Sequence, residues 1–207
     1  MNKLKTLNII LLILVFSVNS FSQEEDVKKI REEYVKYNKL ISDYESEGLS
    51  YFPPRFSIKT IQNRPALGPV NFDFTYYYDE NTNIDEVDNP DLAKTWAIIR
   101  KVVYTEGMPS YQDYKEILYD EKGELLFYYS KLTGNTCGEK RFYFQNGKLI
   151  KIKFNPITHE DCSDDNDFPE FTRYAGKLTK DDIDWQKWIL KDADDHKNTL
   201  LRLYDAI

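Results

Sequence analysis

Alternating acidic residues between His159 and Glu170 are the pattern in this sequence that comes nearest to metal chemistry. Every second position carries an oxygen, as the ligands of a calcium loop do: Asp161, Ser163, Asp165 and Asp167. The pattern departs from an EF-hand, because Asn166 stands where that loop needs glycine and Thr172 where it needs glutamate. We therefore expect a solvated acidic loop. Calcium at Asp161, Asp165 and Asp167 is the alternative, and no other cofactor is expected.

The two cysteines, Cys137 and Cys162, flank a predicted β-hairpin over residues 140–154. The two open ends of such a hairpin meet at one edge of a sheet, so the cysteines are expected to lie close together. An even pair in an oxidising compartment favours a disulfide. Such a bridge would contribute about 3–4 kcal/mol on the chain-entropy model. A redox or nucleophilic thiol is the alternative, but the chain has no C-x-x-C motif.

Aromatic and basic side chains share one face of two predicted hairpins. Gly123 and Gly147 indicate a three-residue loop in each, a type I turn followed by a bulge. In the second hairpin this register sends Phe142, Phe144, Ile150, Ile152 and Phe154 to the core, which a two-residue turn would not do. The other face of the two hairpins then carries the candidate binding residues: Tyr119, Phe127, Tyr129, Arg141, Tyr143, Lys151 and Lys153.

This mixed face is expected to be open to solvent near Lys151 and Lys153, because a buried lysine without a partner is costly. Flat tyrosine rings bordered by cations would suit an acidic sugar or an acidic protein segment. The alternative is that a terminal helix covers the face.

No catalytic residue is assigned from the sequence. It contains no nucleophile elbow, zinc-protease helix, phosphate loop or zinc-type Cys/His spacing. Of the two histidines, His159 is expected to be solvated and His196 to pack on the apolar side of a C-terminal helix. Glycoside chemistry by two carboxylates stays open, since 35 acidic residues always offer some pair.

The first 22 residues have the three parts of a secretory signal peptide. Lys3 and Lys5 precede an apolar run over residues 9–16, and Ser20 and Ser22 are small residues before a cleavage site at Gln23. The run is too short to cross ~30 Å of hydrocarbon comfortably, which argues against an anchor. We expect residues 23–207 to form one periplasmic or secreted domain without a membrane span.

A helix at each end and a sheet between them are predicted for this domain. Residues 24–47 and 180–206 carry apolar side chains at helical spacing, and Thr179 with Asp182 resembles a capping box. Alternating residues from about 70 to 154 predict an antiparallel meander of five or more strands. Prolines indicate irregular structure over residues 49–69. The expected fold class is α+β.

The chain of 207 residues has 28 basic and 35 acidic side chains, a net charge of −7. Loss of Lys3 and Lys5 with the leader lowers this charge to −9. An acidic surface repels phosphates, so nucleic acid is not an expected partner.

Two hairpin sequences, EILYDEKGELLFYYSK (116–131) and EKRFYFQNGKLIKIKF (139–154), resemble a family of small exported proteins of Bacteroidetes-type bacteria. Its members pair a similar leader with Y-D-E-x-G-x-L-x-F-x-Y and R-[FY]-Y-F-x-[ND]-G-K-L-I hairpins. The resemblance implies export and the hairpin architecture, and it brings no activity with it.

Three functions fit these observations. The first is an exported, non-enzymatic binding domain for a protein or glycan of the cell envelope. The second is a carboxylate-based hydrolase acting on an envelope or glycan substrate. The third is an inhibitor or immunity-type protein whose acidic surface covers a basic partner.

Overall fold

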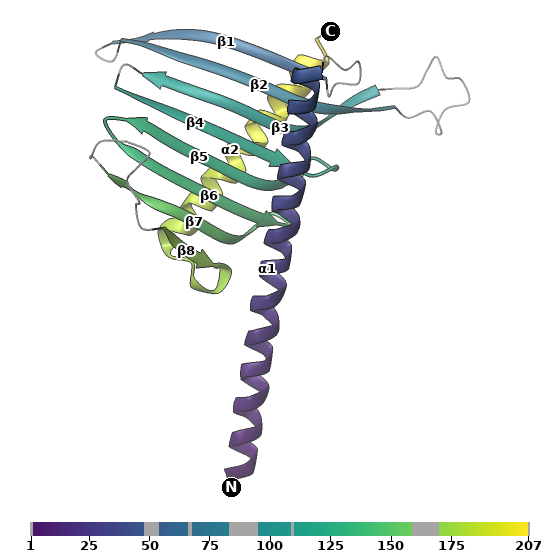
Figure 1. Ribbon diagram of the computed structural model, residues 1–207, viewed down its shortest axis with the longest axis vertical. Coiled ribbons are helices and arrows are strands. Elements are labelled where there is room, and N and C mark those ends of the chain that lie inside the picture. The colour runs from purple at the N-terminus through teal and green to yellow at the C-terminus, as the bar shows by residue number, and fades with distance from the viewer. Residues whose placement is uncertain are drawn as a thin grey trace.

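The computed structural model contains one antiparallel sheet of eight strands with a long helix on each face (Figure 1). The structure describes residues 2–47, 54–65, 68–82, 95–108, 110–158 and 170–206. Side chains are described from residue 23 onward, apart from residues 47, 82, 95 and 156–158. The strands follow one another across the sheet in chain order, from β1 to β8. The predicted α+β meander is therefore confirmed.

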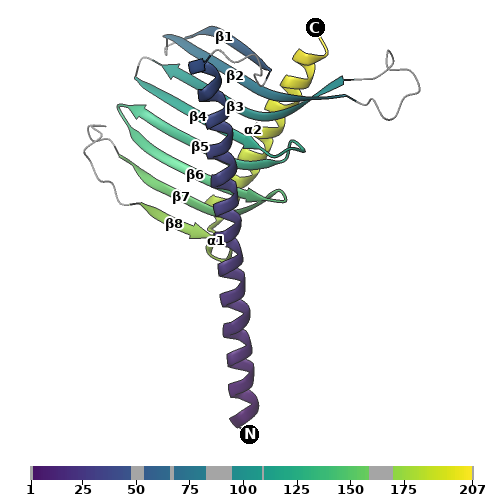
Figure 2. The same ribbon diagram turned by 45° about the vertical axis from the view of Figure 1, so that its right-hand side comes forward.

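Two helices and a short 3₁₀ turn accompany the eight strands. The bounds of all these elements are α1 Asn2–Glu47, β1 Arg55–Arg64, β2 Gly68–Thr82, β3 Thr95–Met108, β4 Tyr111–Tyr119, β5 Leu125–Gly134, β6 Cys137–Gln145, β7 Lys148–Thr158, β8 Phe171–Tyr174, η2 Ala175–Lys177 and α2 Lys180–Tyr204. In Figure 2 the N-terminal half of α1 runs past β8 and away from the sheet. Neither helix, over the residues described, offers a stretch long and apolar enough to span a membrane.

The sheet extends further in both directions than the predicted range of 70–154. Strand β1 lies inside the stretch expected to be irregular and pairs with β2 along its whole length. The reason is that Pro54 and Pro65 bracket the strand without interrupting it, while Phe56 and Ile58 alternate toward the core. At the other end, β8 pairs with β7 and forms the second edge of the sheet.

Helix α2 begins as its sequence predicts. The Thr179 hydroxyl accepts from the Asp182 backbone N–H at 3.3 Å, and the Asp182 carboxylate accepts from the Thr179 N–H at 2.7 Å. Asp182 is fully buried and also accepts from Arg173, at 2.8 Å. The capping box therefore joins the start of α2 to strand β8.

Each helix covers its own hydrophobic core. The α2-side core is the larger and includes Ile189, Ala193 and Leu200 of the helix, packed on Tyr119, Tyr128, Phe142, Phe144 and Ile152. The α1-side core is built from Val27, Ile30 and Tyr37 of the helix against Tyr77, Leu118, Phe127, Tyr143 and Ile150. The sheet is thus buried on both faces. The domain has three layers, which are α1, the sheet and α2 (Figures 1 and 2).

The two hairpin loops differ from one another. Gly123, with φ +75°, donates to the Asp120 carbonyl at 3.0 Å, and this confirms the three-residue loop of the first hairpin. In the second hairpin Gln145 pairs directly with Lys148, and Asn146 and Gly147 both have positive φ. That is a two-residue type I′ turn, so the predicted three-residue loop is wrong here.

A β-bulge explains why the apolar pattern was misleading. Tyr143 pairs with Lys151, yet the next residue, Phe144, pairs with Leu149. The bulge therefore moves Ile150 to the α1-side core and brings Leu149 to the α2-side core, where Ile150 was expected. The two-residue turn and the bulge together keep the faces apolar.

Candidate functional site

Helix α1 is held on its sheet face by polar contacts as well as by apolar ones. The Lys151 ammonium donates to Glu24 at 3.0 Å, and Tyr174 also donates to this carboxylate. Hydrogen bonds from Tyr174 and then Lys151 hold the pKa of Glu24 below its usual range. Further along the helix, at two consecutive positions, Glu33 pairs with Arg100 at 3.1 Å and the Tyr34 hydroxyl donates to Glu116 at 2.9 Å. These contacts fix how α1 lies across the strands.

A groove of about 350 Å³ runs along one side of α1. We call it the α1 groove. The helix contributes Ile30, Arg31, Tyr34 and Val35 to it, and the sheet contributes Phe127, Arg141, Tyr143 and Lys153. Its aromatic rings pack edge to face or tilted: Phe127 lies 5.1 Å from Tyr34 and 5.1 Å from Tyr143, measured between ring centroids.

Three cations line the α1 groove, and they differ in what neutralises them. Arg141 pairs with Glu139 and Glu170, and Lys153 pairs with Glu170. Arg31 instead donates from Nε to the Tyr143 hydroxyl at 3.3 Å, with its guanidinium 5.5 Å from the centroid of that ring. Among the described residues, no carboxylate lies within ion-pair distance of Arg31. Glu24 and Glu170 act on the charge of Arg31 from beyond that distance.

Four of the seven predicted binding residues meet in this groove: Phe127, Arg141, Tyr143 and Lys153. Tyr129 lies next to it, half-buried, with the Arg141 guanidinium 5.8 Å from its ring centroid. Lys151 lies beneath α1, 5% exposed and paired with Glu24. Arg31, Tyr34 and Val35 were not predicted as binding residues, because helix α1 is distant in the chain from the strands that form the other wall of the groove. The available signal was that a cation, a tyrosine and an apolar residue lie close together on the predicted helix over residues 24–47.

The expected open face is not found. Helix α1 covers it, so that Phe127 is 6% and Tyr143 2% exposed. A buried lysine without a partner is costly, but the helix itself supplies the carboxylate that Lys151 needs. What stays accessible is the groove beside the helix.

Tyr119 was assigned to the wrong face of the sheet. A second bulge pairs Leu118 with Phe127 but Tyr119 with Leu125. Tyr119 therefore points into the α2-side core, where its hydroxyl donates to the Ala193 carbonyl at 2.8 Å. It is 1% exposed and has no part in the α1 groove.

Comparison with protein-family models, with curated protein sequences and with solved structures gives no significant match to this chain.

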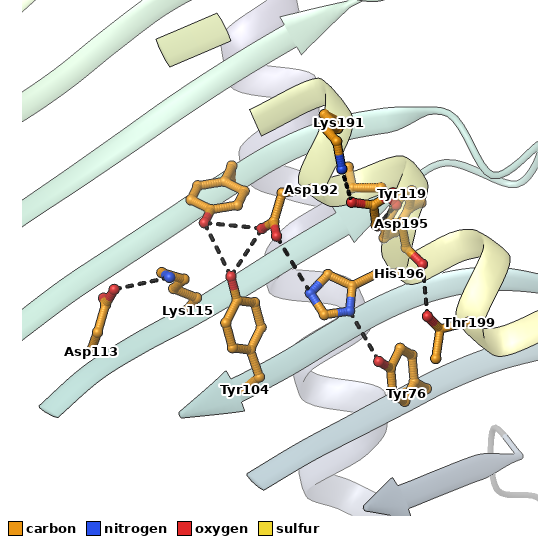
Figure 3. Close-up of polar contacts among 12 residues, drawn as sticks. Tyr76, Tyr104, Asp113, Lys115, Tyr119, Lys191, Asp192, Asp195, His196 and Thr199 are labelled. Carbon is orange, nitrogen blue, oxygen red and sulfur yellow. Dashed lines mark hydrogen bonds and ion pairs between the residues drawn. The ribbon is translucent and has the colours of Figure 1, made fainter. Parts of the chain in front are cut away.

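A buried polar cluster lies on the opposite face of the sheet, under α2 (Figure 3). His196 Nδ1 is 3.0 Å from the Tyr76 hydroxyl, and the Asp192 carboxylate accepts from Tyr104 at 2.9 Å and from Tyr128 at 3.3 Å. As predicted, His196 packs on the apolar side of the helix. Burial lowers its pKa, so the ring is neutral at pH 7. With every member buried or half-buried, the cluster joins α2 to the sheet.

Two predicted sites fall partly or wholly outside the described residues. Asp161, Asp165 and Asp167 lie outside them, and so does His159. Within the part of the chain that the structure describes, no group of three metal-ligating side chains comes together. Cys137 is 9% exposed and is not a free thiol. Its predicted partner, Cys162, also lies outside the described residues, so the pairing stays a prediction.

Proposed function

We propose that this chain is an exported, non-enzymatic binding domain whose α1 groove holds an acidic segment of a partner protein. The observation that carries the proposal is Arg31, a cation without a carboxylate partner among the described residues, at the wall of an aromatic groove of about 350 Å³.

The composition of the groove supports a protein partner. Arginine and tyrosine dominate the energetics of protein interfaces, because they combine a large apolar area with directed hydrogen bonds. Val35, 63% exposed, extends the apolar wall outward along the helix. An acidic segment that also carries an apolar side chain would use both properties: its carboxylate would pair with Arg31 and its apolar group would rest between Phe127 and Val35.

The hydrolase alternative has less support from the geometry. A pair of carboxylates for glycoside chemistry needs one member free to hold a proton. The two carboxylates at the rim of the α1 groove, Glu139 and Glu170, are instead engaged as counterions of Arg141.

Export and a Cys137–Cys162 disulfide belong to the same proposal. Among the side chains described, Glu24 is the first of α1 to contact the sheet, and it is the second residue after the proposed cleavage site. The N-terminal half of the helix runs beyond the sheet (Figure 1). Residues 24–26 are all acidic, which suits the first turn of a helix that begins there. These features support cleavage of the leader before Gln23.

Binding of a labelled peptide tests the groove. The probe is a fluorescein-tagged hexapeptide of alternating aspartate and leucine, measured by fluorescence anisotropy, and its asparagine counterpart is the neutral control. Arg31→Ala should weaken binding of the acidic peptide by about tenfold or more, as expected for loss of a charge-assisted pair.

Lys28→Ala is the matched control, since it removes one positive charge from the exposed side of the same helix. It should change the affinity by less than about twofold. The proposal fails if Arg31→Ala and Lys28→Ala behave alike, or if the asparagine peptide binds as tightly as the acidic one.

A further inference from the structure

A second groove, of about 300 Å³, lies between α2 and the opposite face of the sheet. We call it the α2 groove. Its walls include Trp185 and Trp188 of the helix and Tyr128, Phe142, Lys115 and Lys140 of strands β4 to β6. It is separated from the α1 groove by the sheet itself, so the two can be tested independently.

Lys140 is the unusual member of this groove. Its Nζ lies 4.0 Å from the centroid of the Trp185 ring, and the side chain is half-buried. Within the described part of the chain, no carboxylate comes within ion-pair distance of it. Burial lowers the pKa of Lys140, and the more distant Asp113 offsets this in part. A half-buried ammonium without a counterion is destabilising, so an anion bound here would relieve a cost already present in the fold.

One end of the α2 groove, next to Lys140, is lined by polar side chains. The Lys115 ammonium pairs with Asp113 at 2.9 Å, and the Ser130 hydroxyl donates to the same carboxylate at 3.0 Å. Figure 3 shows Asp113 and Lys115 side by side next to the buried cluster. Because Asp113 and Ser130 also line the groove, they present an acceptor and a hydroxyl to whatever lies in it.

The aromatic wall is in part solvent-exposed. Trp185 and Trp188 are one helical turn apart and pack edge to face on Phe142 and Tyr128, with centroids 5.9 Å apart in both pairs. Trp188 is 50% exposed, an unusual exposure for so large an apolar ring. Flat indole faces beside a polar end match the apolar C–H faces and the hydroxyl rims of a sugar ring.

We propose that the α2 groove binds a carboxylate-bearing oligosaccharide, such as a chain of uronic acids. A sugar ring would rest against Trp188, its hydroxyls would reach Asp113 and Ser130, and its carboxylate would pair with Lys140. Neither an inorganic anion nor a neutral sugar would use all three parts of the groove. This binding site goes beyond the proposed function, which concerns the other face of the sheet.

Tryptophan fluorescence provides the test, because two of the three tryptophans line the groove. The probe is a trimer of 1,4-linked galacturonic acid, with maltotriose as its neutral counterpart. The acidic trimer should change the emission saturably, and maltotriose should bind at least about tenfold more weakly, the effect of losing one ion pair.

Lys140→Gln should weaken binding of the trimer about tenfold, and Trp188→Ala should weaken it by at least about fivefold. Lys131→Gln is the matched control, since Lys131 is exposed on β5 and outside the groove. Far-ultraviolet circular dichroism establishes that each variant is folded.

Three results would overturn the proposal: no binding of the trimer, equal binding of maltotriose, or equal effects of Lys140→Gln and Lys131→Gln. Competition by the aspartate–leucine hexapeptide that is abolished by Lys140→Gln would also overturn it, because the groove would then be a peptide site.

Discussion

His196 shows how much a single side chain depends on what surrounds it. Its ring lies among Phe74, Tyr76 and Tyr104, with centroids 4.9–5.8 Å away. Burial lowers its pKa and the nearby Lys115 acts in the same direction, while Asp192 and Asp195 oppose them. In the unfolded chain a histidine titrates near pH ~6.5. As the pH falls through this value the unfolded state binds the proton first, so protonation favours unfolding.

We therefore expect the free energy of unfolding to fall from about pH 7.5 to 5.5, by up to ~1.4 kcal/mol per pH unit from this group. His196→Gln removes the titrating group and should flatten that slope, at some cost in stability at pH 7. Urea denaturation followed by circular dichroism at each pH gives the comparison. His159 is present in both proteins, so a slope unchanged by the substitution would exclude His196 as its source.

At the scale of elements, the contact between α2 and β8 depends on one carboxylate. Asp182 completes the capping box with Thr179 and accepts from Arg173 of β8. Burial raises the pKa of Asp182, but hydrogen bonds from Thr179 and the charge of Arg173 outweigh burial and leave that pKa below its usual value. A carboxyl group with a lowered pKa stabilises the fold above the pKa of its unfolded form, near ~3.9, and loses this effect as the pH falls.

Asp182→Ala should lower the free energy of unfolding by about 1–3 kcal/mol at pH 7, because it removes the cap and leaves Arg173 without its partner. Asp181→Ala is the control: it removes an exposed acid from the same first turn and should cost less than about 1 kcal/mol. Chemical denaturation at pH 7 and pH 3 measures both. A difference between the two variants that persists unchanged at pH 3 would contradict this role of the ionised carboxylate.

Elements with local sequence signals could be predicted, whereas features that depend on contacts between distant residues could not. The capping residues and helical spacing predicted α2, and alternation predicted the central strands. Asn146–Gly147 is a typical type I′ turn, but the apolar pattern argued against it because a bulge compensates for the changed register. The covering of the mixed face depends on Glu24, which is 127 positions away from Lys151. No local pattern predicts that pairing.

For the molecule as a whole, the side chains described in the two cores all follow the proposed cleavage site before Gln23. Near the start of the described part of α1, Glu24 pairs with Lys151 and Val27 is fully buried.

We expect the protein recovered from the periplasm or medium of an expressing bacterium to span residues 23–207 and to lack two hydrogens, those of Cys137 and Cys162. Intact-mass measurement before and after reduction gives both results. As a control, a chain that lacks residues 2–22 and stays in the reducing cytosol should retain both thiols. Recovery of residues 1–207 in the membrane fraction would argue against cleavage, and an unchanged mass on reduction would argue against the disulfide.

The place of α1 in the chain affects the order in which the molecule can assemble. Each strand pairs with its neighbour in chain order, but the helix crosses strands from β2 to β7. Arg31 and its partner Tyr143 are 112 positions apart. Ribosomes and translocation channels both release the N-terminus first, and α1 therefore emerges before the surface that it covers has been made. Until these strands have been made, Val27, Ile30 and Tyr37 have no apolar partner on that face. During this interval the nascent helix is the segment that a chaperone would recognise, and the rapid local pairing of a meander keeps the interval short.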